Sequence, residues 1–188
     1  LYLGYLGKAK GSFDLLSAAK IVLNQVEGIA FDLVGKELAA GELNQLHSQV
    51  TDMGLDQFVH IRPAVTGAEK IKLFRSADIF VYPSYHEGMP MAVIEAMACG
   101  LPIVATQVGG LPDLVSPGLN GLLVPAGQPD HLAEAIHKLV VNPQMMYSMQ
   151  ASSFQLAQEN FDVEVHVTRL VSIYQSLSLS LQKTTTPC

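Results

Sequence analysis

Charged side chains are scarce in this chain, and those of positive sign are the scarcer. Lysine and arginine together number 11 among 188 residues, against 17 aspartates and glutamates, so the formal net charge is −6. This balance argues against a nucleic-acid or anionic-membrane surface. Hydrophobic residues make up 49% of the chain and charged ones 15%, which excludes the disordered class. The length predicts a single domain.

Cysteines, a leader segment and long apolar runs are also lacking. The two cysteines, Cys99 and Cys188, set no disulfide framework, which fits a reducing, cytoplasmic setting. No signal peptide is visible, and no apolar run approaches the ~20 residues of a membrane span. We therefore expect a cytoplasmic protein, at most peripheral to a membrane, with no transmembrane segment in this chain. Leu1 stands where an initiator methionine would, which suggests a fragment of a longer protein.

Several cofactor-binding patterns are missing. The glycines of the first loop, residues 4–11, are spaced neither as G-x-G-x-x-G nor as a P-loop. NAD binding and P-loop NTP hydrolysis therefore lose their usual support. No Asp-x-Asp occurs, and the six histidines have no metal-ligand spacing with a cysteine or carboxylate. The sequence predicts neither a metal site nor a cofactor.

Strand-like and helix-like segments alternate along the chain. Strands are expected at 1–5, 29–34, 59–61, 78–82, 102–105 and 121–124. Helices are expected at 12–23, about 37–51, 66–76, after Pro90, and at 129–140, 143–158 and 163–181, with a frayed tail at 184–188. Thr66 and Glu69 have the spacing of a capping box. Repeated βα units favour one α/β domain with a Rossmann-like, doubly wound parallel sheet. Its ligands would bind at the carboxyl ends of the strands, where residues 4–11, 83–90 and 106–110 fall.

Two glutamates, eight positions apart, are the main candidates for a binding site. Glu87 precedes the helix that begins at Pro90, and Glu95 is the only charged residue between Gly88 and Gly100. A carboxylate in so apolar a segment is costly to bury without hydrogen-bond donors. Glu95 is suited to the vicinal hydroxyls of a ribose, and Glu87 to a sugar. Alternatively, Glu95 is a buried carboxylate satisfied by an amide or a lysine, and Glu87 is a solvated loop residue.

The start of the helix at Pro90 is a candidate anion site. Proline at the first helical position loses no hydrogen bond, and the helix dipole helps neighbouring amides to bind an anion. No lysine or arginine occurs within 76–137, so backbone dipoles would do most of the local work. The amides concerned are those of Gly88, Met89, Met91 and Ala92. The alternative is an ordinary βα turn that starts with a proline. The methionines at 89, 91 and 97 are expected in the core and not as cofactor ligands.

The first loop adds two cations, Lys8 and Lys10. Either could neutralise a phosphate, whereas loop lysines without such a role are simply solvated. His86 adjoins Glu87 and could line the same site, and the alternative for it is a structural role.

These segments resemble the C-terminal domain of GT-B glycosyltransferases, specifically the large retaining group 1 family. The resemblance is carried by the run PSYHEGMPMAVIEAMACGLPIVAT at 83–106, by VGGLPD at 108–113 and by NGLLVP at 120–125. Lys10-Gly11 and ADIFVYP at 77–83 also fit, and the coverage runs from about Leu3 to Leu139. Two glutamates in this context are a specific signal, whereas either alone is not.

The resemblance implies a site for a nucleotide-diphosphate sugar. Glu95 would hold the ribose hydroxyls, and Glu87 would contact the donor sugar as the catalytic residue. Amides after Gly88 would bind the diphosphate, and Lys10 would neutralise phosphate charge. Arg62, at a strand end, would flank the base. Further implied contacts, with weaker support, are Lys8, His86, Gly109 and Gly110. Transfer would retain the anomeric configuration without a metal, assisted by the leaving diphosphate.

Two features depart from the family pattern. An arginine usually follows the first-loop glycine, whereas Tyr5 stands there; Lys8 could substitute, although it cannot bind phosphate in the bidentate manner of arginine. The family also pairs two Rossmann-like domains, and this chain holds one. An absent N-terminal domain would bind the acceptor, a sugar or lipid in polysaccharide or glycolipid biosynthesis, and the helix at 163–181 would pack on it. The alternatives are a non-catalytic nucleotide-sugar-binding or scaffold module and a GT-B sugar epimerase.

Overall fold

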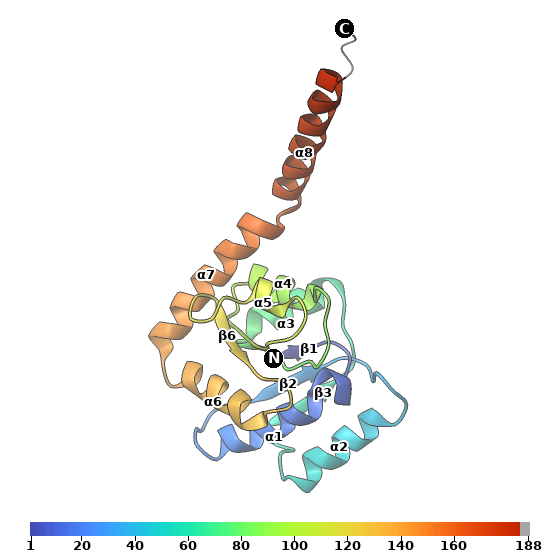
Figure 1. Ribbon diagram of the computed structural model, residues 1–188. Helices are drawn as coiled ribbons and strands as arrows, with labels where there is room; N and C mark the ends of the chain where they lie inside the picture. The colour runs from blue at the N-terminus through green and yellow to red at the C-terminus, as the bar shows by residue number, and fades with distance from the viewer. Residues whose placement is uncertain (185–188) are drawn as a thin grey trace.

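Parallel strands with intervening helices make up the molecule. The computed structural model describes residues 1–184 (Figure 1). The strands are β1 (Tyr2–Leu3), β2 (Phe31–Val34), β3 (Val59–Arg62), β4 (Phe80–Tyr82), β5 (Ile103–Thr106) and β6 (Gly121–Val124). The helices are α1 (Ser12–Leu23), α2 (Glu42–Asp52), α3 (Gly67–Ser76), α4 (Met91–Ala98), α5 (Leu111–Leu114), α6 (Pro129–Val140), α7 (Pro143–Phe161) and α8 (Val163–Thr184), with a 3-10 turn, η1, at Lys8–Lys10.

The strands form two three-stranded parallel sheets, ordered β1-β2-β3 and β4-β5-β6. The sheets meet at β1 and β4, because the Val81 amide donates to the Leu1 carbonyl at 2.9 Å and the Tyr2 ring stacks on Tyr82, 5.7 Å between centroids. The strand order across the molecule is therefore 3-2-1-4-5-6, the order of a doubly wound Rossmann-like fold. This confirms the predicted fold class. The order reverses between β1 and β4, and we call this position the switch point.

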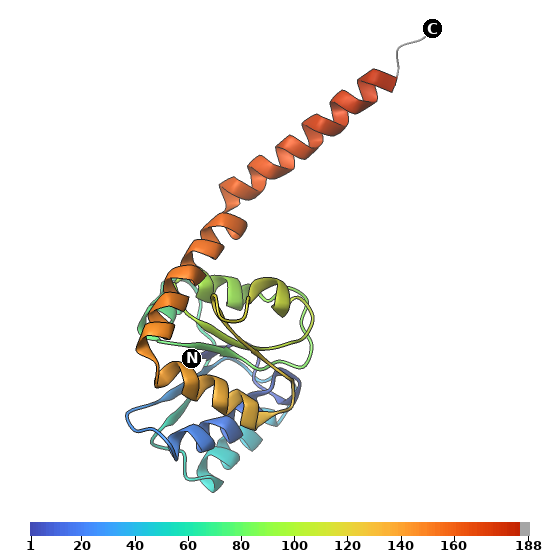
Figure 2. The same ribbon diagram turned by 60° about the vertical axis from the view of Figure 1, so that its left-hand side comes forward.

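Helices cover both faces of the sheets (Figure 2). α1 packs against α6 on one face, and α4 packs against α7 on the other. Strands β4 and β5 are buried along their whole length, as their apolar runs predict for strands covered on both sides. Each large aliphatic side chain buried in this way contributes about 1.5–3 kcal/mol, so the central strands form a rigid support for the loops that follow them.

The first strand and the second helix are shorter than predicted. β1 has 2 residues instead of five, because the chain turns after Leu3 to meet the segment that follows β2. There the Leu6 amide donates to the Lys36 carbonyl and the Leu38 amide to the Leu6 carbonyl, both at 2.8 Å. α2 consequently begins at Glu42, after Gly41 with φ +85°.

Two further details differ from the sequence-based expectations. Thr66 is the N-cap of α3, but its side chain makes no capping hydrogen bond, so the predicted capping box is wrong. Gly67 has φ +58°, and this left-handed residue turns the chain away from the geometry that the box requires. The short helix α5 was not predicted, because four residues are too few to show a helical period.

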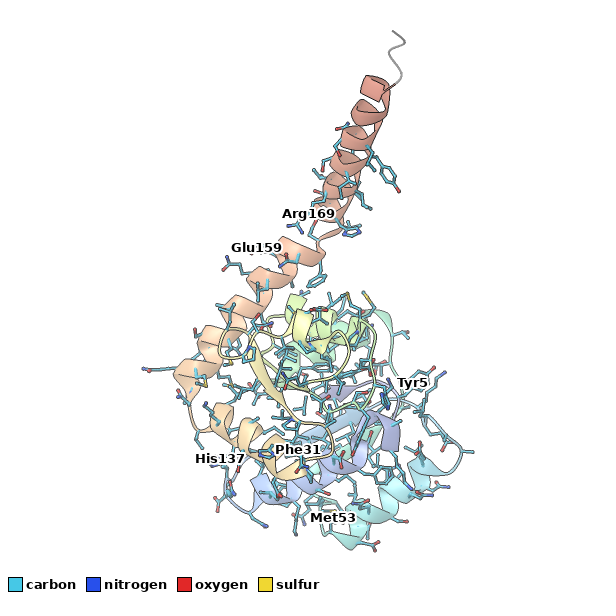
Figure 3. The ribbon with its side chains drawn as sticks, in the orientation of Figure 1. Tyr5, Phe31, Met53, His137, Glu159 and Arg169 are labelled. Atoms are coloured by element: carbon cyan, nitrogen blue, oxygen red, sulfur yellow. The ribbon has the colours of Figure 1, made fainter. Side chains whose placement is uncertain are left out.

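α8 extends away from the sheets and their helices (Figures 1 and 2). Its first turns are tied to the end of α7, where the Arg169 guanidinium donates to the Glu159 carbonyl at 3.0 Å (Figure 3). Within residues 1–184, none of the helices has the length and apolar character needed to cross a membrane. The tail predicted at 184–188 lies outside the described residues, apart from Thr184, which ends α8.

Candidate functional site

The loops that follow β1 and β4 meet at the switch point. The Tyr85 amide donates to the Ala9 carbonyl at 3.1 Å. Gly11, at φ +69°, brings the first loop so close to the second that a β-carbon there would lie 2.0 Å from the Pro83 carbonyl oxygen. Only glycine fits both the left-handed conformation and this approach. The two loops are therefore locked together, at the strand ends where the sequence placed them.

Lys10 and Glu87 form an ion pair across these two loops. Lys10 Nζ lies 2.5 Å from Glu87 Oε1, and the Glu87 side chain is only 9% exposed. Lys10 Nζ also reaches the His86 carbonyl at 3.5 Å. The alternative in which Glu87 is a solvated loop residue is therefore wrong. A carboxylate so poorly hydrated needs a partner, and the first loop supplies it.

Two buried tyrosines, which the sequence analysis missed, lie close to Glu87. Burial, followed by the charge of Glu87, raises the pKa of Tyr82. Burial, followed by Tyr82 and Glu87, raises the pKa of Tyr2. Both hydroxyls therefore stay protonated at neutral pH, and that of Tyr2 donates to the Tyr5 carbonyl. Tyr82 ends β4, and this position at a carboxyl end was the available signal for it, whereas Tyr2 begins β1 and gave no such signal.

Glu95 is not buried, contrary to the expectation from its apolar surroundings in the sequence. Its side chain is 36% exposed, and Lys70 Nζ lies 2.6 Å from its Oε1. The apolar neighbours turn to the other side of α4, where they are buried: Val93, Ile94, Ala96 and Met97. Lys70 comes from α3 and was not singled out in the sequence. The sequence analysis considered, as an alternative, that a lysine satisfies Glu95. The structure contains this lysine partner, although the carboxylate is not buried.

The start of α4 exposes backbone amides between the two glutamates. Pro90 is the N-cap, in an extended conformation, and not the first helical residue as predicted. The amides of Gly88 and Met89 donate to no protein acceptor in the part of the chain that the structure describes. The first amides of any helix also lack intrahelical partners, and here these are the amides of Met91 and Ala92. An anion at this turn would meet unpaired donors and the positive end of the helix dipole.

Two of the three methionines in this region are exposed. Met89 is 53% and Met91 63% exposed, whereas Met97 is buried. The expectation that all three belong to the core is therefore wrong for the first two. Met89 precedes α4 and Met91 is its first residue. Both methionines therefore lie before the packed part of the helix and beside the unpaired amides.

Gly109 and Gly110 support the Glu87–Gly88 turn from behind. A β-carbon on Gly109, which has φ +52°, would lie 1.8 Å from the Glu87 carbonyl oxygen, and one on Gly110 would lie 2.3 Å from that of Gly88. The Gly110 amide donates to the Gly88 carbonyl at 2.9 Å. These glycines hold the turn through close backbone contact.

Lys8 and His86 line a different part of this edge. Together with Phe13, Asp14 and Tyr85 they surround a hollow of about 530 Å³. The Lys8 amide is held by Glu42 Oε1 at 3.1 Å. His86 is exposed. Both residues therefore belong to this hollow, and within residues 1–184 neither side chain pairs with Glu87 or Glu95.

Arg62 is the last residue of β3, and Tyr5 follows β1. Arg62 forms an ion pair with Asp32 at 2.8 Å, and the residues that follow it, Ala64 and Val65, line a hollow of about 230 Å³ with Tyr5 and others. Tyr5 lies at the edge of the body (Figure 3). Within residues 1–184, no group of three or more histidines, cysteines, aspartates or glutamates is placed to hold a metal ion.

Sequence comparison identifies the family. Residues 1–155 match the family model described as glycosyl transferases group 1. A D-inositol 3-phosphate glycosyltransferase 1 from Catenulispora acidiphila is 33% identical over 182 residues, which cover 94% of this chain and 43% of that relative. The chain belongs to the group 1 glycosyltransferase family.

Solved structures extend this comparison to the fold of group 1 glycosyltransferases. HepE from Anabaena, determined with UDP, superimposes with a TM-score of 0.79 at 27% identity, covering 97% of this chain and 48% of that one. The C-terminal domain of the group 1 protein LpcC from Francisella tularensis, at 22% identity, shares the fold with a TM-score of 0.79 and coverage of 86% and 85%. The chain thus spans less than half the length of the curated relative and of HepE.

Proposed function

We propose that this chain is the donor-binding half of a retaining hexosyltransferase and that it binds a nucleotide-diphosphate sugar. The observation that carries the proposal is the arrangement of Glu87 and Glu95, each held by a lysine, on either side of the exposed amides at the start of α4. Glu87 is suited to a sugar, the amides to a diphosphate and Glu95 to a ribose. These three groups follow one another in the same order as the parts of a nucleotide-diphosphate sugar. HepE, which shares this fold, was solved with UDP and with UDP-glucose.

Each part of the donor has a proposed contact. The amides of Gly88, Met89, Met91 and Ala92 bind the diphosphate, and Lys10 adds positive charge. Glu95 accepts hydrogen bonds from the ribose hydroxyls, and Glu87 accepts them from the sugar. The base occupies the hollow beside Ala64 and Val65. We no longer assign the base contact to Arg62, as the sequence suggested, because Asp32 already neutralises Arg62.

The proposed reaction needs no metal, cofactor or enzymic nucleophile. The bond between the anomeric carbon and the phosphate oxygen breaks, and an acceptor hydroxyl oxygen bonds to the same face of that carbon. The hydroxyl proton passes to the departing phosphate oxygen. Negative charge that develops on the diphosphate is stabilised by the helix-start amides and by Lys10, which are fixed before the reaction begins. Glu87 orients the sugar for this step.

Transfer would require a second domain that binds the acceptor, a sugar or lipid. We propose that α8 packs on such a domain, because it extends away from the body and exposes apolar side chains four, seven and eleven positions apart, a spacing that places them along one side of a helix. These are Val163, Val167, Leu170 and Tyr174. We further propose that the full-length enzyme is cytoplasmic or membrane-peripheral. The alternative of a non-catalytic module is favoured by one residue, Tyr5, which stands where the family carries arginine.

Thermal unfolding with added ligand tests the donor site. UDP, GDP, ADP and their sugars are screened at millimolar concentration. We expect at least one to raise Tm, since a ligand at 100 times its Kd stabilises the folded state by about 2.7 kcal/mol. No shift with any of them would overturn the proposal. A shift combined with no transfer by the full-length protein would favour the module.

A further inference from the structure

Three cations discussed above, Lys10, Lys70 and Arg62, are each paired with a carboxylate within the protein. Lys10 and Lys70 each lie next to a glutamate, at 2.5 and 2.6 Å, and Arg62 lies 2.8 Å from Asp32. A diphosphate brings further negative charge to the switch point. Charge-assisted hydrogen bonds to phosphate are the strong ones, so a cation without a carboxylate partner would contribute most.

Lys36 is such a cation. Its Nζ lies 5.1 Å from the centre of the Tyr5 ring, and among residues 1–184 no carboxylate pairs with it. Both residues follow central strands, β2 and β1, and both line the hollow of about 230 Å³ together with Gly4 and Gly35. Tyr5 is 45% exposed and lies at the edge of the body (Figure 3). A cation–π contact at an exposed ring is weak, so a phosphate can draw the ammonium away.

Lys8, the substitute that the sequence suggested for the arginine, has less suitable surroundings. The hollows that it lines contain Asp14 on one side and Asp52 on the other. Its backbone is fixed by Glu42. An anion placed there would meet acidic neighbours, whereas no acidic residue of the described chain lines the hollow beside Lys36.

We propose that Lys36 binds the diphosphate of the nucleotide donor and that Tyr5 positions it. The Tyr5 ring lies under the Lys36 ammonium and keeps it at the hollow that we propose for the base until a phosphate takes its place. This chain would thereby obtain from the loop after β2 the charge that an arginine at position 5 would supply. The inference rests on the proposed donor site.

Titration calorimetry of Lys36→Gln tests the inference with UDP, GDP or ADP, whichever binds the wild-type chain, and with the matching uncharged nucleoside. We expect the Kd for the diphosphate to rise roughly tenfold, the loss of one charged hydrogen bond, with the nucleoside unaffected. Lys138→Gln, which makes the same charge change on α6, should bind like the wild type; Figure 3 shows its neighbour His137 on the opposite side of the body from Tyr5. Tyr5→Leu should weaken the diphosphate less than Lys36→Gln does, and Lys36→Arg should restore binding.

The possible results separate the two proposals. A wild-type chain that binds none of these diphosphates removes the donor site and the inference together. Wild-type binding that Lys36→Gln leaves unchanged overturns the inference alone, as does a loss found in Lys8→Gln instead. An equal loss of diphosphate and nucleoside would show that Lys36 acts through the shape of the hollow, which also contradicts the proposal.

Discussion

The two lysine–glutamate pairs have nearly the same length but lie in different surroundings. Lys10–Glu87 joins two loops that are locked by backbone contacts, and its glutamate side chain is 9% exposed. Lys70–Glu95 joins α3 to α4, and its glutamate is 36% exposed. Exposed ion pairs contribute only about 0–1 kcal/mol, whereas a buried carboxylate without a partner is costly. The fold therefore fixes Glu87 in place, while Glu95 can exchange its lysine for a ligand at small cost.

The largest expected effect comes from breaking the support behind Glu87. In Gly109→Ala the new β-carbon would lie 1.8 Å from the Glu87 carbonyl oxygen at φ +52°. We expect the free energy of unfolding to fall by roughly 2–5 kcal/mol, the sum of left-handed strain and overpacking. Gly118→Ala is the control, since Gly118 has φ +84° with nothing near its β-carbon, and it should lose only about 1–2 kcal/mol. Equal losses in urea unfolding would show that the Glu87 turn is not held by this contact.

Removing each lysine in turn should separate the two pairs. Lys10→Met leaves Glu87 without its cation, and we expect the free energy of unfolding to fall by about 2–3 kcal/mol, somewhat less than for a fully buried pair. Lys70→Met should cost no more than about 1 kcal/mol. Adding Glu87→Gln to Lys10→Met should recover part of the loss, because no uncompensated charge remains. Losses of the same size in the two lysine variants would contradict the distinction between buried and exposed pairs.

The smallest effect concerns alkaline pH. Burial and Glu87 raise the pKa of Tyr82 above its usual value near 10, so the unfolded chain releases this proton before the native one does. The stability that Tyr82 contributes is complete below about pH 10 and declines as pH rises above it. Between about pH 10 and 11 the free energy of unfolding should therefore decline less steeply in Tyr82→Phe than in the wild type, by up to about 1.4 kcal/mol per pH unit. The same slope in the variant and the wild type would show that Tyr82 ionises as readily in the native protein.

Sequence reasoning predicted the features that depend on local pattern. β4 was evident because a strand covered on both faces is a continuous apolar run, and the loops after the strands were placed correctly because parallel strands share one carboxyl edge. The approach of the loops after β1 and β4 followed from this topology, and their hydrogen bond between Tyr85 and Ala9 agrees with it.

Features that depend on contacts between distant segments could not be predicted. Lys70 contacts Glu95 from another helix, and no local sequence pattern around either residue predicts this contact. The apolar neighbours of Glu95 suggested burial, but a helix turns successive residues to different sides, and the carboxylate is left partly exposed. Lys36 was overlooked because its significance depends on where the Tyr5 ring lies.

Calorimetric titration of Glu87→Gln and Glu95→Gln tests the central claim most directly. Each variant is titrated with the nucleoside diphosphate that stabilises the wild-type chain and with the corresponding nucleotide sugar. We predict that Glu95→Gln weakens both ligands, because both carry the ribose, and that Glu87→Gln weakens only the nucleotide sugar. The opposite order, with the free diphosphate more sensitive to Glu87→Gln than to Glu95→Gln, would contradict the proposed roles of the two carboxylates.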